Sequence, residues 1–260
     1  MRQTLDGVPI DEIAIRRIQA HAPDDGLYVA FSGGKDSVVI LDLVKRSGVP
    51  FDAHYNLTTA DPPEVVYFVR RFPEVQIHKP RDKDGKFMSI WRLIRKKGMP
   101  PRRNARFCCE VMKEQGGKGR TVVTGVRWAE SANRSKRGMY EGCYKDGSKH
   151  YLNPIIDWTT ADVWHYIRSR WLDYCSLYDE GFKRVGCVLC PMGNRAQAEK
   201  EAQRWPGIAR LWEMSIKAGF RQIDKPGAFE NAQELWEWWF SREDAQSREE
   251  LPMLFGEEDG

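Results

Sequence analysis

The stretch "VAFSGGKDSVVIL", residues 29–41, places polar and flexible residues directly after an apolar run. The pattern predicts a buried strand over 26–32 and a helix over 35–48 that ends at Gly48. Glycines in the turn let backbone N–H groups approach an anion, and the helix N-terminus adds partial positive charge. The stretch therefore predicts an anion site at the carboxyl end of a strand, formed by Ser32, Gly33, Gly34, Lys35, Asp36 and Ser37.

Each polar side chain of this turn suits a phosphate. Lys35 supplies a full positive charge, Ser32 and Ser37 supply hydroxyl donors, and Asp36 can hold Mg²⁺. The spacing differs from the Walker A loop, which has four residues between its first glycine and Gly-Lys, and from the dinucleotide fingerprint. The turn is therefore a candidate phosphate loop of a different kind.

The composition is that of an ordinary globular protein. The 260 residues are 41% hydrophobic and 30% charged, with a formal net charge of +4, so an anion-binding surface must be local. No apolar run reaches the length of a membrane span, and the N-terminal residues lack the apolar core of a signal peptide. We therefore expect a cytoplasmic protein without a membrane partner.

Apolar runs alternate with helical patterns through the first two thirds of the chain, which predicts an α/β fold with a doubly wound, mostly parallel sheet. After Gly193 the pattern becomes helical and rich in tryptophan, and packing is the expected role of those rings. We expect a nucleotide-binding domain with a cysteine site over 1–193 and a helical extension over 194–260. The predicted strands are 26–32, 51–57, 75–80 and 120–126, and the predicted helices are 35–48, 62–72, 87–98 and 157–171.

A second polar block, "TGVRWAESANRS" at 124–135, follows the fourth predicted strand. Its arginines suit an oxyanion, because guanidinium groups bind phosphate and sulfate in a bidentate manner. The end of this strand falls on the same edge of the sheet as the glycine turn. We therefore expect Arg127 and Arg134 to face the same anion, with Glu130 and Ser131 contributing to the pocket.

Four of the six cysteines form two pairs that are far apart in the sequence. Cys108 and Cys109 are adjacent, and Cys187 and Cys190 form a C-x-x-C. Four thiolates can complete one site for zinc or for an iron–sulfur cluster. Basic neighbours such as Arg106 would lower the thiol pKa values. We expect the four sulfur atoms to converge on one metal centre.

These blocks, in this order, resemble a known family. "SGGKDS" is similar to the PP-loop of the adenine nucleotide alpha-hydrolase-like superfamily. Together with the arginine block, "NPIIDWTTADVWHYI" (153–167) and "LYDEGFKRVGCVLCPM" (177–192), it resembles the phosphoadenosine phosphosulfate (PAPS) reductase family over about residues 25–193. The resemblance implies that an adenine nucleotide, ATP or adenylyl sulfate (APS) or PAPS, binds at the loop. The cysteine pattern resembles the [4Fe–4S] motif of APS reductases, which favours that cluster over zinc.

The chain departs from these reductases after Cys190. The resemblance implies a nucleophilic cysteine in a C-terminal Glu-Cys-Gly motif, yet residues 191–260 contain no cysteine. This departure favours an ATP pyrophosphatase that adenylates a substrate for sulfur transfer, as in related PP-loop enzymes. The alternatives are a sulfonucleotide reductase with a displaced or external thiol, and a non-catalytic nucleotide-binding module with a structural metal.

The segment 92–106 contains seven basic residues and no acid, and it leads directly into the adjacent cysteine pair. Such a segment suits a nucleic-acid backbone, and it equally suits a solvated helix end. Nucleic acid is therefore a candidate partner, beside a protein that donates sulfur or electrons.

Overall fold

A computed structural model describes the chain except residues 1, 4, 83, 145–146, 221–228 and 243–260. The chain forms two compact units, each assembled from segments that are distant in the sequence. Unit 1 comprises Met1–Leu57, Asp61–Lys79 and Lys113–Gly186, and unit 2 comprises Thr58–Ala60, Pro80–Met112 and Cys187–Gly260.

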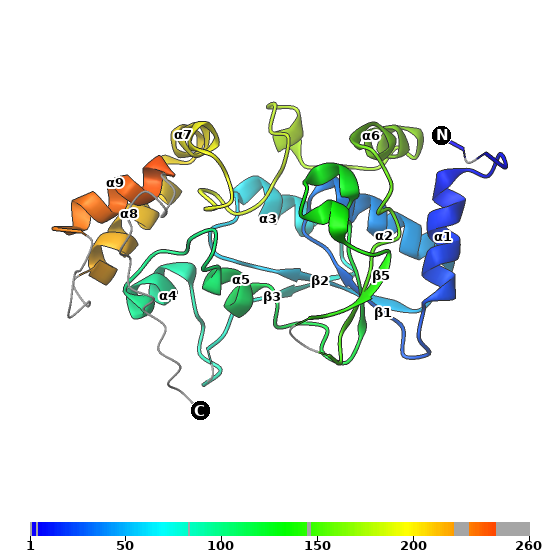
Figure 1. Ribbon diagram of the computed structural model, residues 1–260, viewed down its shortest axis with the longest axis horizontal. Helices are drawn as coiled ribbons and strands as arrows, with labels where there is room; N and C mark the ends of the chain where they lie inside the picture. Colours follow the sequence, from blue (N-terminus) through cyan, green and yellow to red (C-terminus); the bar gives the residue numbers. More distant parts are fainter. Residues whose placement is uncertain (1, 4, 83, 145–146, 221–228, 243–260) are drawn as a thin grey trace. The chain divides into compact units, whose positions relative to one another are not determined.

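Unit 1 contains a six-stranded sheet in the order β3-β2-β1-β4-β6-β5 (Figure 1). Four neighbouring pairs are parallel and only β5 runs antiparallel, against β6, which confirms the predicted α/β class with a mostly parallel sheet. Strand order reverses beside β1, which pairs with β2 on one side and β4 on the other. The bounds are β1 Leu27–Ala30, β2 Phe51–Asn56, β3 Val75–His78, β4 Thr121–Val123, β5 Tyr140–Gly142 and β6 His150–Leu152.

The helices of unit 1 begin and end where the sequence supplies capping residues. Gly48 ends α2 in the left-handed conformation, with φ +73°. Thr159 caps α6, where its hydroxyl accepts a hydrogen bond from the Asp162 N–H at 3.1 Å and the Asp162 carboxylate accepts one from the Thr159 N–H. The bounds are α1 Ile10–Ala20, α2 Lys35–Ser47, α3 Pro63–Val69 and α6 Thr160–Ser169.

The core of unit 1 lies between the sheet and α2. Val39, Leu43 and Val44 of the helix are fully buried, as are Leu27 and Val29 of β1. Figure 1 shows α2, α3 and α6 on one side of the sheet. Because burial of an aliphatic side chain stabilises by about 1.5–3 kcal/mol, this packing fixes the end of β1, and with it the glycine turn.

Unit 2 is helical and is centred on tryptophans, which confirms their expected packing role. Trp212 is 1% exposed, its ring meets Trp91 edge-on at 5.3 Å, and it stacks on Trp239 at 4.8 Å. Gly219 lies against the backbone of α4, where an added Cβ would be 3.2 Å from the Ile94 carbonyl oxygen. The bounds are α4 Ile90–Lys97, α5 Phe107–Met112, α7 Arg195–Arg204, α8 Pro206–Phe220 and α9 Ala232–Ser241.

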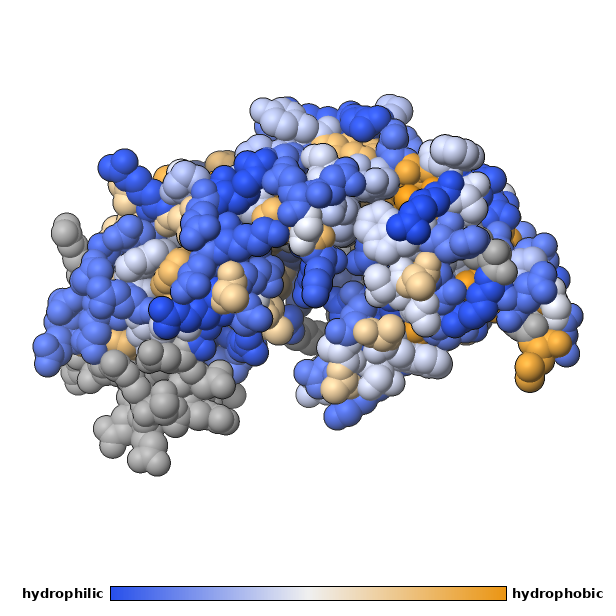
Figure 2. All heavy atoms as spheres, turned by 90° about the horizontal axis from the view of Figure 1, so that it is seen from above, coloured by the Kyte–Doolittle hydropathy of each residue, from blue (hydrophilic) through white to orange (hydrophobic). Residues whose placement is uncertain are grey.

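The units differ from the domain boundary expected at residue 193. Residues 80–112 group with the C-terminal helices, because α4 packs against α8. The sequence analysis also missed β5, β6 and α5, which have three to six residues each. The molecular face in Figure 2 is mostly hydrophilic. Among the described residues, no helix has the length and apolar character needed to cross a membrane.

Candidate functional site

The turn after β1 requires glycine at its second position. Gly33 has φ +72°, a left-handed conformation that residues with a side chain rarely adopt. A Cβ at this position would also lie 3.0 Å from methyl carbons of Val65 and Val69. Gly34 then serves as the N-cap of α2. The chain therefore enters the helix through two residues that have no side chain of their own.

The two serines of the turn bond to each other and to its backbone. The Ser32 hydroxyl donates to the Ser37 hydroxyl at 3.2 Å, and the Ser37 hydroxyl donates to the Gly34 carbonyl at 2.8 Å. The Gly34 N–H points back to the Ser32 oxygen at 3.4 Å. These contacts hold the turn in shape, and nucleotide contact by the hydroxyls stays a prediction.

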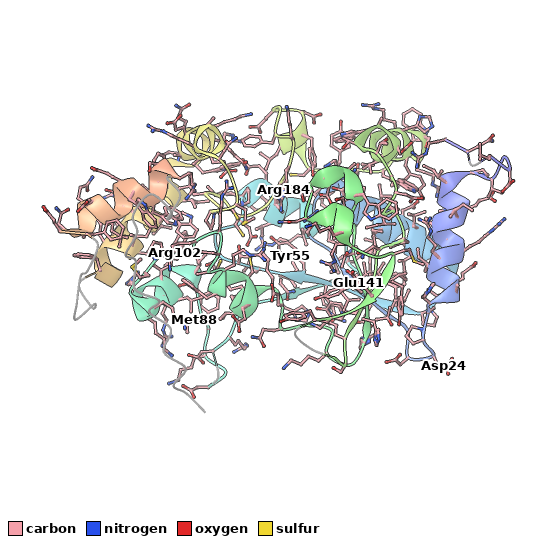
Figure 3. The ribbon with its side chains drawn as sticks, viewed as in Figure 1. Asp24, Tyr55, Met88, Arg102, Glu141 and Arg184 are labelled. Atoms are coloured by element: carbon pink, nitrogen blue, oxygen red, sulfur yellow. The ribbon has the colours of Figure 1, made fainter. Side chains whose placement is uncertain are left out.

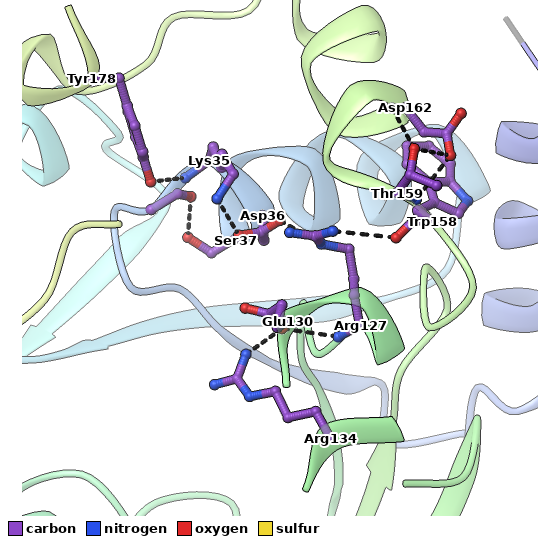
Figure 4. A network of polar contacts seen from close by, with 11 residues as sticks. Lys35, Asp36, Ser37, Arg127, Glu130, Arg134, Trp158, Thr159, Asp162 and Tyr178 are labelled. Carbon is purple, nitrogen blue, oxygen red and sulfur yellow. Dashed lines mark hydrogen bonds and ion pairs between the residues drawn. The ribbon is translucent and has the colours of Figure 1, made fainter. Parts of the chain in front are cut away.

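A cluster of three charged side chains, those of Lys35, Asp36 and Arg127, lies at the start of α2 (Figure 4). Lys35 and Arg127 are only 6% and 1% exposed. The Lys35 ammonium lies 3.2 Å from one Asp36 oxygen, and Arg127 Nε donates to the other at 2.8 Å. Arg127 Nη1 also donates to the Trp158 carbonyl at 3.2 Å. Two cations thus share one carboxylate, and the resulting excess of positive charge at a helix N-terminus favours an anion.

The engagement of Asp36 bears on the predicted metal. Both of its carboxylate oxygens already contact cations, so Mg²⁺ would compete with Lys35 and Arg127 for Asp36. Gly125, just after β4, makes the ion pair sterically possible. A Cβ there would lie 2.9 Å from the Asp36 Cβ. Asp36 is therefore best described as the residue that orients Lys35 and Arg127.

The other residues of the arginine block shape their own loop. The Glu130 carboxylate accepts the Arg127 N–H at 3.0 Å and forms an ion pair with Arg134. The Ser131 hydroxyl accepts the Arg134 N–H at 3.3 Å. Arg127 reaches the start of α2 directly, whereas Arg134 is linked to that group only through Glu130 (Figure 4). A direct contact of Arg134, Glu130 or Ser131 with an anion stays a prediction.

Tyr178 joins the site without having been predicted as a site residue. Its hydroxyl accepts the Lys35 N–H at 2.9 Å, and the Lys35 ammonium lies 5.5 Å from its ring centre. Burial raises the pKa of Tyr178, and the positive charge of Arg184, labelled in Figure 3, opposes that shift. The tyrosine lies 143 residues from Lys35, and its block carried no spacing that revealed the contact.

The four predicted cysteines all belong to unit 2 and influence one another. Hydrogen bonding to Cys109, burial, and the charges of Cys109, Cys187 and Cys190 raise the pKa of Cys108. Because charge effects weaken with distance, this coupling indicates that the two pairs lie near each other. The expectation that basic neighbours would lower the thiol pKa is wrong for Cys108. Within the described residues, no group of three or more Cys, His, Asp or Glu side chains has metal-binding geometry.

Only part of the basic segment 92–106 is exposed on the surface. Arg92, Arg95, Lys96 and Lys97 are exposed on α4. Burial lowers the pKa of Arg102, which follows α4 in the sequence (Figure 3). Arg103 donates to the carbonyls of Pro191 and Gly193, both at 3.3 Å. Part of the predicted nucleic-acid surface therefore supports the cysteine-bearing loop.

Fold and site together define an α/β protein in which a glycine-containing turn joins the first strand to a helix. The turn lies where the strand order reverses, which is the usual position of a ligand site in such sheets. Residues 26–193 match the phosphoadenosine phosphosulfate reductase domain, and the chain belongs to that family. The match contains the glycine turn, the arginine block and all four cysteines of the two pairs.

The similarity of this chain to individual members and relatives is low, as three examples show. An uncharacterized protein of Methanocaldococcus jannaschii is 28% identical over 231 residues, which are 84% of this chain and 46% of the relative, so the chain spans about half of that protein. Adenosine 5'-phosphosulfate reductase 2 of Bacillus subtilis is 25% identical over 76% of this chain and 86% of its own length. A crystal structure of PAPS reductase from Candida auris in a phosphate complex shares the fold, with a TM-score of 0.53, 24% identity, and coverage of 71% of this chain and 90% of that one.

Proposed function

We propose that the chain binds a sulfonucleotide, APS or PAPS, at the glycine turn and takes part in its reduction to sulfite. The observation that carries the proposal is the buried Lys35–Asp36–Arg127 group at the N-terminus of α2, inside the region that matches the family. A phosphate or sulfate would meet the Lys35 ammonium and the first N–H groups of the helix. The B. subtilis relative named as an APS reductase supports the choice of substrate.

The residues divide into binding and positioning roles. Lys35 binds the phosphate next to the sulfate, and the glycines of the turn let the backbone approach it. Asp36 and Arg127 orient Lys35. Tyr178 holds the Lys35 N–H while no anion is bound. In this scheme the loop neutralises the nucleotide 5'-phosphate as it leaves.

Reduction of the sulfonyl sulfur consumes two thiols. A thiolate attacks sulfur, the sulfur–oxygen bond to the nucleotide breaks, and the 5'-phosphate leaves; a second thiol then releases sulfite and forms a disulfide with the first. Of the two cysteines outside the pairs, Cys143 is half-buried, whereas Cys175 is 1% exposed and burial raises the pKa of its thiol, so Cys175 is a poor nucleophile. A donor protein with a reactive dithiol would supply both electrons.

Four thiols are the ligand type of iron–sulfur and zinc sites, and the charges of Cys109, Cys187 and Cys190 all act on Cys108. We propose that these residues hold a [4Fe–4S] cluster, with zinc as the alternative. When bound, such a cluster supplies negative charge and electron-transfer capacity to unit 2. The thiols must lose their protons on binding, so loading releases protons and weakens at low pH.

A second candidate is an ATP pyrophosphatase that adenylates an acceptor for sulfur transfer. It is favoured by the lack of any cysteine in residues 191–260. The same loop would bind the β- and γ-phosphates of ATP, and pyrophosphate would leave. The exposed basic residues of α4 would then contact a nucleic-acid acceptor.

One assay distinguishes these functions. Anaerobically purified protein is incubated with APS, PAPS or ATP, with and without a reduced dithiol protein such as thioredoxin, and sulfite and pyrophosphate are measured. Dithiol-dependent sulfite from APS or PAPS supports the reductase, and pyrophosphate from ATP in the presence of an acceptor supports the second candidate. Lys35→Ala is the matched control, because either activity must fall with it. Activity that persists in this variant contradicts the assignment of the loop.

A further inference from the structure

The two residues between Cys187 and Cys190 have every backbone polar group bonded. The Val188 N–H donates to the Ala60 carbonyl at 2.7 Å, and the Val188 carbonyl accepts the Trp212 indole N–H at 3.0 Å. The Leu189 N–H donates to the Glu201 carboxylate at 2.6 Å, and the Leu189 carbonyl accepts Arg242 Nη2 at 2.9 Å. All these groups belong to unit 2. The loop that carries the second cysteine pair is therefore held in a single conformation.

Three of the four partners come from the C-terminal helices, which lie beyond the region that matches the family. Glu201 is on α7, Trp212 is on α8, and Arg242 follows α9 (Figure 1). Leu189 has φ +56°, a conformation that is uncommon for leucine and needs support from its surroundings. The C-terminal helices thus impose an unfavourable backbone conformation between two candidate ligands.

Arg242 is a partly buried cation that has no ion-pair partner among the described residues. Nη1 donates to the Trp239 carbonyl at 2.9 Å, the guanidinium lies 4.3 Å from the Trp239 ring centre, and Nε is buried without a hydrogen-bond acceptor. Burial lowers the pKa of Arg242 to about 10, while the charges of Cys190 and Glu201 act in the opposite direction. Partial burial of a cation whose Nε has no acceptor is costly, and a nearby negative charge offsets that cost.

Arg103, which precedes the first cysteine pair in the sequence, contacts the same loop. It donates to the carbonyls of Pro191 and Gly193, which directly follow the second pair, and its charge disfavours that of Arg242. Arg103 likewise forms no ion pair with any residue that the structure describes. Two arginines near each other, Arg103 exposed and Arg242 partly buried, are thus both bonded to backbone carbonyls of one loop and form no ion pair with a carboxylate among the described residues.

We propose that Arg242 and Arg103 are positioning residues that supply the counter-charge of the four-cysteine centre, and that the C-terminal helices set its C-x-x-C loop. The inference rests on the metal centre of the proposed function. Four thiolates around Zn²⁺ or a [4Fe–4S]²⁺ core carry a net charge of about −2, which two arginines balance. Hydrogen bonds and charges around such a centre tune its stability and its reduction potential.

The test uses the full chain with Arg242→Met and Arg103→Met, which remove the charge and keep much of the side-chain length. Arg210→Met, an exposed arginine of α8, is the matched control. Iron and sulfide content, the rate of iron loss to a chelator and the midpoint potential are measured after anaerobic reconstitution. We expect each charge-removing variant to lose iron about 10-fold faster than wild type. The midpoint potential should become more negative, because reduction adds negative charge.

Arg242→Lys restores the charge and should recover the potential, although the bond to the Leu189 carbonyl changes. If Arg242→Met does not fold, Arg103→Met and Arg242→Lys decide the question. Wild-type iron retention and potential in folded Arg242→Met or Arg103→Met overturn the inference while the cluster itself stands. A wild-type chain that holds zinc contradicts the cluster, and chelator-driven zinc release in the same variants then tests the arginines. A wild-type chain that holds neither metal refutes both proposals.

Discussion

Arg127→Met should destabilise unit 1 strongly, because it removes a buried cation from a bonded carboxylate. The change deletes the 2.8 Å bond to Asp36 and the 3.2 Å bond to the Trp158 carbonyl. A hydrogen bond to a charged group contributes about 1.5–3 kcal/mol, and a buried carbonyl left without a donor costs about 1–3 kcal/mol. Since Asp36 keeps Lys35 and its side chain is 19% exposed, the lower ends apply. The expected loss is about 2.5 kcal/mol.

The assay is thermal and urea unfolding of Arg127→Met beside a matched arginine variant. Arg134→Met breaks an ion pair whose arginine is 34% exposed, and it should cost less than about 1 kcal/mol. A loss of about 2.5 kcal/mol corresponds to a melting temperature lower by about 5–10 °C. In the double variant with Asp36→Asn, the cost should be smaller than the two single costs added. Additive costs, or equal losses in Arg127→Met and Arg134→Met, would refute the reasoning.

Three further predictions concern the turn and the opposite part of the sheet. Gly33→Ala should lower the free energy of unfolding more than Gly48→Ala does. Both glycines have φ near +73°, but only at Gly33 would the new Cβ meet other atoms, the methyl carbons of Val65 and Val69 at 3.0 Å. Equal losses in the two variants would contradict this crowding. Tyr178→Phe should tighten sulfonucleotide binding about fivefold in calorimetry, because it frees the Lys35 N–H from a bond of about 1 kcal/mol; weaker binding would assign the hydroxyl to the ligand. Burial, and then the charge of nearby His54, lowers the pKa of His78 below its usual 6.5. The unfolded chain therefore binds the proton more readily than the folded chain, and stability should fall as the pH drops below about 6.5. A pH dependence of stability that is unchanged in His78→Asn would exclude this residue as the source.

Local signals predicted the elements that hold the site. The glycine turn and the end of α2 at Gly48 are encoded within a few residues, and both occur as expected. Strands β5 and β6 escaped prediction because three residues carry too little hydrophobic pattern to recognise. Short elements of this kind are fixed by their pairing partners.

Contacts between residues that are far apart in the sequence could not be predicted from local sequence patterns. The ion pair of Asp36 with Arg127 spans 91 residues, and the Lys35–Tyr178 bond spans 143. The arginine block therefore suggested two direct anion ligands, whereas the structure bonds one to Asp36 and the other to Glu130. In the same way, the bond from Arg242 to Leu189 has no local signature, since it joins residues that are 53 positions apart.

The central claim is that the turn at residues 32–37 binds a sulfonucleotide through Lys35, and the most direct measurement is calorimetric titration of APS into wild type, Lys35→Ala and Lys45→Ala. Lys45 lies on the same helix but at its other end, where it pairs with Glu74. The account predicts that Lys35→Ala weakens binding by about 1.5–3 kcal/mol, roughly 10- to 150-fold, because a charge-assisted contact is lost. Lys45→Ala should bind APS as wild type does. Equal affinities for APS in all three proteins would contradict the claim.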